Sequence, residues 1–566
     1  MNKGIRQVLH PVLIGLIAAV AAEGPHALQV YCPWISRLAA ILILEVTILV
    51  VILQRFIFDR KPVIRGYCGL SDLFLHIHGS GMSDSPGRWT LRGVISFLLA
   101  AVGAPLGAEG AASEFGHAFA IRSRERSSRW FEQRRRTDAG AALAAGISAA
   151  FGAPFAGILV PIELGMGGET ISSVLSSLSA FVGMRWITRQ LALEKFSIGM
   201  SLQGFRLTTF HEWICLLIIA LLAGVLAAGV IQFNRYGFRS LKDLFQSQIW
   251  ARTLVGGILL FLLVFLCKQG SLSPRVTLEQ VFLARNSLIE TLFLFLIQGL
   301  GLVLVLAAFG TVGIFWPLFA LGGMLGYGVD QLIPCGTLGF STLAIFTGGA
   351  SFLAAGVGTP IAGALLAYEL THNLNVLVPC LIAGALAQKI RSVLKTAHWV
   401  ESDLQLRGVH LVGGRSLSIL ESIPVREAMV TDFETVGEKE PVSELQSKLI
   451  KSRYPFLPVV NPQGRYLGLL TVDMVQESRN LEDPLASHSP LSRLLEAKDL
   501  LYRSGFKTPA LEIHDKLSAT AGVFEEGPCV PVLGEEGRVL GLLFAYNVRF
   551  AYEREEARRS LLEVDT

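Results

Sequence analysis

One acidic residue stands out in the apolar N-terminal part of this chain. Glu109 lies between Gly107 and Gly110, directly after the apolar run 93–106. A carboxylate at membrane depth costs roughly 2.5–3.5 kcal/mol at a helix centre, so such residues usually face a cavity and serve function. Glu109 also lies at the predicted start of a helix, where unpaired backbone N–H groups and the helix dipole favour an anion. A site that holds a carboxylate in this way is suited to a free anion.

The elements that must position Glu109 belong to an apolar block. Of the 566 residues, 52% are hydrophobic and 17% are charged, against about a quarter charged in soluble domains. Charged residues return to ordinary density after about residue 395, which predicts a polytopic membrane domain followed by a soluble domain. The net charge of +4, without a basic stripe, argues against a nucleic-acid partner. The seven cysteines are scattered and form no Cys-x-x-Cys pair, so we expect neither a disulfide framework nor a metal site.

Apolar runs in the first part of the chain are candidates for membrane spans. They lie near 8–31, 38–58, 91–106, 139–162, 171–189, 212–232, 252–267, 287–309, 313–332, 341–368 and 375–394. Several are shorter than the roughly 20 residues that a spanning helix needs, and Gly or Pro interrupts many of them. Interrupted helices are tolerated at membrane depth only when they are buried in protein or line a cavity. The pattern therefore favours a transporter or channel.

Two stretches of this block are similar to each other. Residues 151–164 read FGAPFAGILVPIEL and residues 357–370 read VGTPIAGALLAYEL, with the glycines, the proline and the acids Glu163 and Glu369 in register. Many transporters consist of two such halves, with the site at their interface formed by broken helices. Two unrelated helices with small residues for close packing are the alternative. Both acids lie at predicted helix ends, where we expect them to face water.

A helix start led by glycine precedes each copy of the repeat. Residues 107–110 precede the first copy, and Gly313-Ile314-Phe315-Trp316-Pro317 precedes the second. This pairing predicts that two helix N-termini converge on one anion. Between them, residues 122–136 contain seven arginines, and the positive-inside rule places this loop in the cytoplasm.

The C-terminal part, residues 421–553, is predicted to contain two βαββα units. The first has strands at Phe433–Val436, Phe456–Val460 and Tyr466–Thr471 and a helix at Val442–Ser452. The sequences Pro-Val-Val at 458–460 and Leu-Gly-Leu-Leu at 467–470 return as Pro-Val-Leu at 531–533 and Leu-Gly-Leu-Leu at 540–543. Both motifs recur at the same distance along the sequence, which indicates a tandem pair of domains.

Together these features resemble the CLC family of chloride channels and chloride/proton exchangers, followed by a CBS-domain pair. Residues 313–317 match the family motif GxFxP, and 106–111 match GxEGP without its proline. Residues 79–83 match GSGIP except at the last two positions, and 154–163 match the helix that ends in the family's acidic pair. The resemblance covers most of the membrane domain.

The resemblance implies an all-α polytopic membrane domain over 1–405, an inverted internal repeat of broken helices. It also implies a cytoplasmic α/β CBS pair at 421–480 and 490–553. By the same resemblance the chain is a homodimer in the lipid bilayer. It transports chloride or another small anion and performs no covalent chemistry.

The family's site residues can be placed on this sequence through the motifs. The Ser80 hydroxyl, with Gly81 beside it, would bind the central anion together with the backbone N–H groups of Ile314 and Phe315. Gly110 would line the outer anion site. Glu109 would be the gate, blocking the path when ionised and moving away when protonated.

Two departures from the family bear on proton coupling. Glu163 matches the first residue of the acidic pair, but Leu164 stands where exchangers usually carry an inner glutamate, and leucine cannot relay a proton. The family's central tyrosine falls at Val400, or at Trp399 with a shift of one residue. These departures favour a gated chloride channel, and the alternative is an antiporter with a non-standard inner proton route.

The CBS pair gives a weaker indication of a ligand. Residues Gly468, Thr471 and Asp473 partly match a Gly-x-x-Thr/Ser-x-x-Asp segment that binds adenine nucleotides, but the acid comes one position early. The second copy has Phe544 and Asn547 at the equivalent places. An adenine nucleotide therefore remains an alternative to a dimerisation and gating module without a ligand.

Functions of other classes fit less well. A cation transporter or a CBS-regulated membrane sensor would be expected to place several acids at membrane depth, and only Glu109, Glu163 and Glu369 are candidates. The apolar block contains no Ser/His pair, paired Asp or His-Glu-x-x-His arrangement, so we expect no catalytic residues.

Overall fold

The computed structural model of the chain describes most of its sequence. The described residues are 3–53, 69–78, 85–123, 131–166, 170–193, 207, 209–245, 248–267, 271–335, 339–406, 420, 423–452, 454–472, 474–475, 496–504, 510–520, 523–525 and 529–564. Contacts divide the chain into two units, the first of residues 1–77 and 84–408 and the second of residues 78–83 and 409–566.

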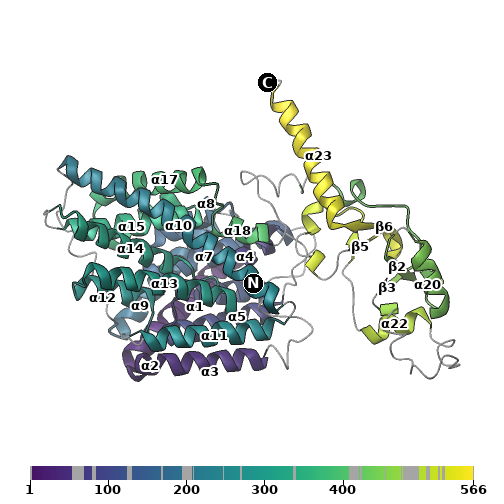
Figure 1. Ribbon diagram of the computed structural model, residues 1–566, viewed down its shortest axis with the longest axis horizontal. Coiled ribbons are helices and arrows are strands. Elements are labelled where there is room, and N and C mark those ends of the chain that lie inside the picture. Colours follow the sequence, from purple (N-terminus) through teal and green to yellow (C-terminus); the bar gives the residue numbers. More distant parts are fainter. Residues whose placement is uncertain are drawn as a thin grey trace. The chain divides into compact units, whose positions relative to one another are not determined.

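The first unit is helical (Figure 1). Among the described residues, six segments are long and apolar enough to cross a membrane: Val8–Tyr31, Phe210–Gly237, Ile249–Leu266, Leu288–Phe309, Phe340–Val357 and Leu374–Val393. The helices outside the repeat include α1 (Lys3–Tyr31), α2 (Trp34–Arg37), α3 (Ala39–Ile52), α4 (Gly69–His78), α5 (Pro86–Ala101), α6 (Glu109–Arg122), α9 (Thr170–Gln190), α10 (Phe210–Phe245), α11 (Ile249–Leu266), α12 (Pro274–Leu283), α13 (Leu288–Phe309), α14 (Phe315–Leu332), α17 (Leu377–Val393) and α18 (Trp399–Leu406).

The two repeat copies share one interrupted shape, so two predicted spans, 139–162 and 341–368, are each broken. In the first copy α7 (Phe131–Phe151) ends before Gly152, and α8 (Pro154–Glu163) follows. In the second copy α15 (Phe340–Val357) ends before Gly358, and α16 (Pro360–Thr371) follows. Both glycines have a positive φ, +67° and +93°. Glycine after a helix and proline at the first position of the next one explain the two breaks.

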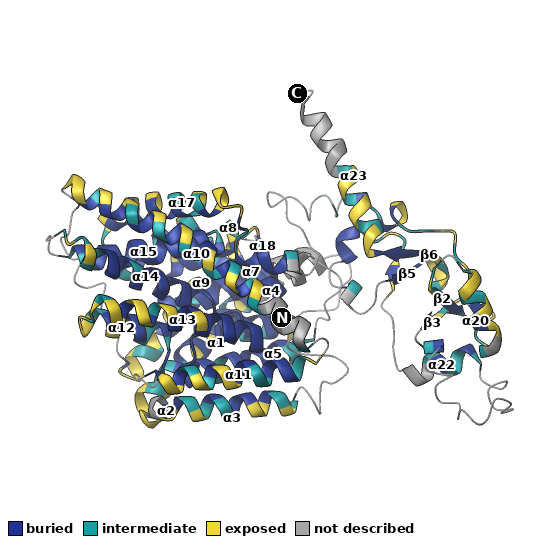
Figure 2. Cartoon of the chain, viewed as in Figure 1, coloured by how far each residue is buried: buried dark blue, intermediate teal, exposed yellow. Residues whose placement is uncertain are grey.

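The centre of this unit lies around α14 (Phe315–Leu332) and α15, which are almost wholly dark blue in Figure 2. Helices α3, α11, α12 and α17 instead carry exposed residues. At the centre, a Cβ atom on Gly322 would lie only 2.1 Å from the carbonyl oxygen of Gly348. Glycine is therefore required where the backbones of α14 and α15 meet, as is common between membrane helices.

The second unit contains two small sheets of the same topology. The strands β1 (Val436–Gly437), β2 (Phe456–Val460) and β3 (Tyr466–Thr471) form the first sheet, and β4 (Leu511–Glu512), β5 (Cys529–Leu533) and β6 (Val539–Phe544) form the second. In each sheet the first pair is parallel and the second is antiparallel. The helices α20 (Val442–Lys451), α22 (Ala497–Ser504) and α23 (Ala545–Val564) complete the unit.

The tandem pair predicted from the sequence is confirmed by this topology. Pro458 faces Leu469 in the first sheet, and Pro531 faces Leu542 in the second. The strands predicted at Phe456–Val460 and Tyr466–Thr471 agree with β2 and β3. The strand predicted at Phe433–Val436 is wrong in extent, because only Val436 and Gly437 pair with β2.

Candidate anion site

Glu109 is the first residue of α6 (Glu109–Arg122), and its side chain is fully buried. Its carboxylate lies at the N-terminus of α14, where the backbone N–H groups of Phe315 and Trp316 donate to Oε1 at 2.8 and 3.1 Å. Oε2 has no hydrogen-bond partner among the described residues. Two backbone donors at a positive helix end are a ready-made anion site. Here the carboxylate takes the place of an anion.

The glycines around Glu109 allow two chain segments to approach each other. The Gly107 N–H donates to the carbonyl oxygen of Gly313 at 3.1 Å. A Cβ atom on Gly313 would lie 2.3 Å from the Gly107 carbonyl oxygen, and one on Gly110 would lie 2.6 Å from the Gly313 nitrogen. Any side chain at these positions would separate α6 from the start of α14, so the glycines are needed for the carboxylate to reach its donors.

A third helix, α4, begins beside this pair. The Gly69 N–H donates to the carbonyl oxygen of Thr311 at 2.7 Å, just before α14. The Arg92 guanidinium donates to the carbonyl oxygen of Gly310 at 2.6 Å and also binds Asp72 of α4. Arg92 therefore ties α4 to the segment that leads into α14.

A fourth helix, α18, reaches the same region through Ser71 near the start of α4. The buried Ser71 hydroxyl donates to Oδ2 of Asp403 at 3.2 Å. Trp399 lies four residues earlier, on the same face of α18. Its indole Nε1 is buried and has no hydrogen-bond partner among the described residues. The starts of α4, α6 and α14 thus lie together, and α18 is joined to them through Asp403.

A comparison with protein families identifies the family of this chain. The sequence profile of the voltage-gated chloride channel (CLC) family matches residues 45–392, which is more than half of the chain. The chain belongs to the CLC family. A CBS-domain profile matches residues 425–477, and the repeated sheet topology extends the match to a CBS pair. The family and fold class expected from the sequence are therefore confirmed.

The chain is also similar to curated CLC relatives. The H(+)/Cl(-) exchange transporters ClcA of Yersinia pestis bv. Antiqua and Klebsiella pneumoniae are 33% and 31% identical to it over 267 residues. The aligned part is 43% of this chain and 53% and 54% of those relatives. The chain thus spans about half the length of the curated relatives it matches.

Solved CLC structures share the fold. A slow cyanobacterial Cl−/H+ antiporter has a TM-score of 0.58 at 19% identity, covering 72% of this chain and 98% of its own. A eukaryotic CLC transporter has a TM-score of 0.51 at 18% identity, covering 96% and 98%. A CLC-type fluoride/proton antiporter has a TM-score of 0.54 at 21% identity, covering 69% and 97%. At these identities the similarity concerns the fold alone.

The structure describes only some of the residues to which the CLC resemblance gives anion-binding roles. Ser80 and Gly81 lie outside the described residues. The Ile314 N–H, expected to bind the anion with that of Phe315, donates instead to the carbonyl oxygen of Val312 at 2.8 Å. The Glu109 carboxylate accepts hydrogen bonds from the N–H groups of Phe315 and Trp316, so the pair of donors is shifted by one residue from the expected pair.

Sequence reasoning missed a group of buried charges beside the site. Glu114, one turn after Gly110, is fully buried; Ser96 donates to it, and Oε1 lies 3.4 Å from Nε of Arg92. Arg92 also stacks over the Trp89 ring at 5.0 Å. The pattern Glu109-x4-Glu114 within one helix, with Arg92 in the preceding apolar run, was the available signal.

Backbone N–H groups bind both repeat acids, and Glu369 is buried while Glu163 is partly exposed. Glu369 of α16 accepts hydrogen bonds from the N–H groups of Phe155 and Ala156, each at 2.8 Å, at the start of α8. Glu163 of α8 accepts hydrogen bonds from those of Ile361 and Ala362, at 2.9 and 2.8 Å, at the start of α16. The expectation that the acids face water is therefore wrong for Glu369, because a helix N-terminus presents unpaired N–H groups that favour a carboxylate. We call this arrangement the reciprocal caps.

The residues at the family's coupling positions occupy different surroundings. Leu164 is half-buried and follows the last residue of α8. Trp399 and Val400 are both buried in the first turn of α18. Of these two, Trp399 carries a polar hydrogen that an anion can accept, and Val400 carries none.

In the CBS pair, two of the proposed nucleotide residues are described. Gly468 lies in β3, where a Cβ atom would be 2.7 Å from the Leu501 side chain, and Thr471 ends the same strand. The Thr471 hydroxyl accepts a hydrogen bond from the Met474 N–H at 3.4 Å. Asp473 lies outside the described residues.

Proposed function

We propose that the chain transports chloride or a similar small anion across the membrane, along a path that passes the N-termini of α4, α6, α14 and α18. The observation that supports this proposal most directly is the pair of hydrogen bonds that the N–H groups of Phe315 and Trp316 donate to the Glu109 carboxylate. An anion can use these donors only when the carboxylate leaves them. Glu109 would therefore act as the gate, and protonation would release it by removing the charge that α14 stabilises.

One further donor supports a second anion position in this path. The hydroxyl role that the motif comparison gave to Ser80 stays a prediction, because Ser80 lies outside the described residues and the Ser71 hydroxyl of α4 already donates to Asp403. We assign the inner position to Trp399, whose indole N–H is buried without a partner among the described residues. Hydroxyl, indole and amide donors bind an anion without a full positive charge, so the anion can also leave.

The transport would be coupled to protons. The relatives that share 31–33% identity are named H(+)/Cl(-) exchangers, so exchange suits this chain at least as well as the channel favoured from the sequence. The channel remains the second candidate because Leu164 occupies the usual position of the inner acid. An exchanger with Leu164 would need another inner proton route.

The proposal also covers the oligomeric state and the CBS pair. The chain would be a homodimer with the CBS pair on the cytoplasmic side, as the family resemblance implies. The arginines of 122–136 would place that loop on the cytoplasmic side as well. The CBS pair would regulate gating, and an adenine nucleotide is the ligand to test.

The decisive experiment measures the reversal potential of the purified full-length chain in lipid bilayers. Under a chloride gradient alone, the reversal potential is expected to follow chloride and to ignore a potassium gradient. Adding a pH gradient is expected to shift it for an exchanger and to leave it unchanged for a channel. A reversal potential that follows potassium would contradict the proposed function.

A further inference from the structure

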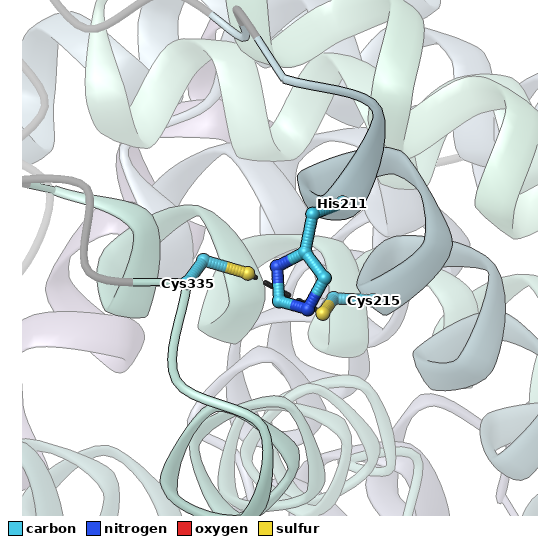
Figure 3. A group of neighbouring side chains, drawn as sticks. All are labelled: His211, Cys215 and Cys335. Carbon is cyan, nitrogen blue, oxygen red and sulfur yellow. Dashed lines mark hydrogen bonds between the residues drawn. The ribbon is translucent and has the colours of Figure 1, made fainter.

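Three side chains with metal-binding atoms meet away from the anion site. His211 and Cys215 lie at the start of α10, and Cys335 follows the end of α14 (Figure 3). Their ligand atoms all lie within 4.8 Å of one another, and the two sulfur atoms are 3.3 Å apart. We call these three residues the His-Cys-Cys cluster.

Local structure explains how the cluster forms. His211 and Cys215 are four residues apart in one helix, so their side chains lie on the same face. Cys335 reaches them because α14 ends at Leu332, and Pro334 cannot continue a helix. The two cysteines are 120 residues apart in the sequence, which is why the cysteine spacing indicated no metal site.

We propose that His211, Cys215 and Cys335 bind a zinc ion or a chemically similar thiophilic cation. Two thiolates and one imidazole are ligands that zinc prefers, with Zn–S of about 2.3 Å and Zn–N of about 2.0–2.1 Å. Tetrahedral geometry with these bond lengths separates two sulfur atoms by roughly 3.8 Å. The observed 3.3 Å therefore requires the two sulfur atoms to move apart by only a few tenths of an ångström.

Charge and access also suit a cation. Glu212 and Asp330 lie close enough for their negative charges to act on Cys335. Binding would release one proton from each thiol, so the two thiolates would neutralise a divalent ion. Cys215 is buried, Cys335 is partly buried and His211 is exposed, which leaves one side open for the metal to enter and for water as fourth ligand.

A disulfide between Cys215 and Cys335 is the competing arrangement. It requires the sulfur atoms to approach to about 2.05 Å, and it would give His211 no role. The metal site uses all three side chains. In either arrangement the start of α10 would be joined to the segment after α14, but only the metal site depends on the imidazole.

The test titrates zinc into the reduced, metal-free full-length chain in detergent, against a chromophoric chelator. The unmodified chain is expected to bind one zinc ion, and His211→Ala, Cys215→Ser and Cys335→Ser are each expected to weaken binding at least tenfold. Cobalt in place of zinc is expected to give a thiolate-to-metal charge-transfer band that is weaker in each serine variant, because one of the two thiolates is lost.

Two matched controls separate the cluster from other sites. Cys267→Ser changes another buried cysteine and His372→Ala another exposed histidine, so both are expected to bind zinc as the unmodified chain does. Equal zinc binding by all variants would overturn the proposal. So would a Cys215–Cys335 disulfide found by peptide mapping in a chain that binds no zinc after reduction.

Discussion

Replacing Glu109 by glutamine tests the gate most directly, because it keeps the size of the side chain and removes its charge. The carboxylate accepts two backbone hydrogen bonds from α14. A hydrogen bond to a charged group contributes about 1.5–3 kcal/mol and a neutral one about 0.5–1.5 kcal/mol. When these two hydrogen bonds change from charged to neutral, the side chain of residue 109 would bind the start of α14 more weakly by about 2 kcal/mol. This corresponds to a roughly 30-fold change in its occupancy of the site.

The apparent chloride affinity reports this change. A ligand whose site is available only part of the time binds more weakly in proportion to that fraction. Glu109→Gln is therefore expected to bind chloride up to about 30-fold more tightly in isothermal titration calorimetry. The affinity of the unmodified chain should rise as the pH falls and Glu109 is protonated, and that of the variant should depend less on pH.

Glu290→Gln is the matched control. Glu290 also accepts a backbone N–H at a helix start, that of Ser287, but at an exposed position in α13. This variant should bind chloride as the unmodified chain does. If Glu109→Gln binds chloride no more tightly than Glu290→Gln, the carboxylate does not compete with the anion and the gate is refuted.

Other parts of the molecule give further expectations. Glu369→Ala removes two buried hydrogen bonds and should lower stability by about 3 kcal/mol, more than Glu163→Ala at its less buried end, as thermal unfolding in detergent would show. Trp399→Phe should weaken chloride binding about tenfold by loss of one donor, whereas Trp186→Phe should leave it unchanged; equal effects would remove Trp399 from the path. Burial raises the pKa of the Cys529 thiol to about 12. Its neutral form thus stabilises the fold below the unfolded pKa of about 8.5, and this contribution is lost as the pH rises toward 12. Alkylation of Cys529 at pH 9–10 should accordingly be slow in the folded chain and fast in urea, and equal rates would contradict its burial.

Much of the fold was predictable from short-range features of the sequence. Glycine followed by proline marked the breaks at 152–154 and 358–360, because each residue type has a fixed effect on the backbone. Short apolar runs marked β2 and β3. The place of Glu109 at a helix start followed from the glycines beside it.

The partners of the acids were not predictable in the same way. The sequence placed Glu163 and Glu369 at helix ends, but only the packing of two halves shows that each carboxylate meets the other helix. The contact between the start of α4 and the segment leading into α14 was likewise not visible in the sequence, because Gly69 and Thr311 are far apart in the chain. Contacts of this kind join positions far apart in sequence, and no local pattern encodes them.

The reciprocal caps impose an order on the biogenesis of the protein. Glu369 is synthesised 214 residues after Phe155, whose N–H it accepts. At about 5–20 residues per second, the start of α8 waits roughly 10–40 s for its acceptor. Unpaired N–H groups in hydrocarbon cost several kcal/mol each, so the first half must remain in a wet or protein-lined environment during that interval. Insertion and folding of the two halves are therefore one process, completed only when α16 enters.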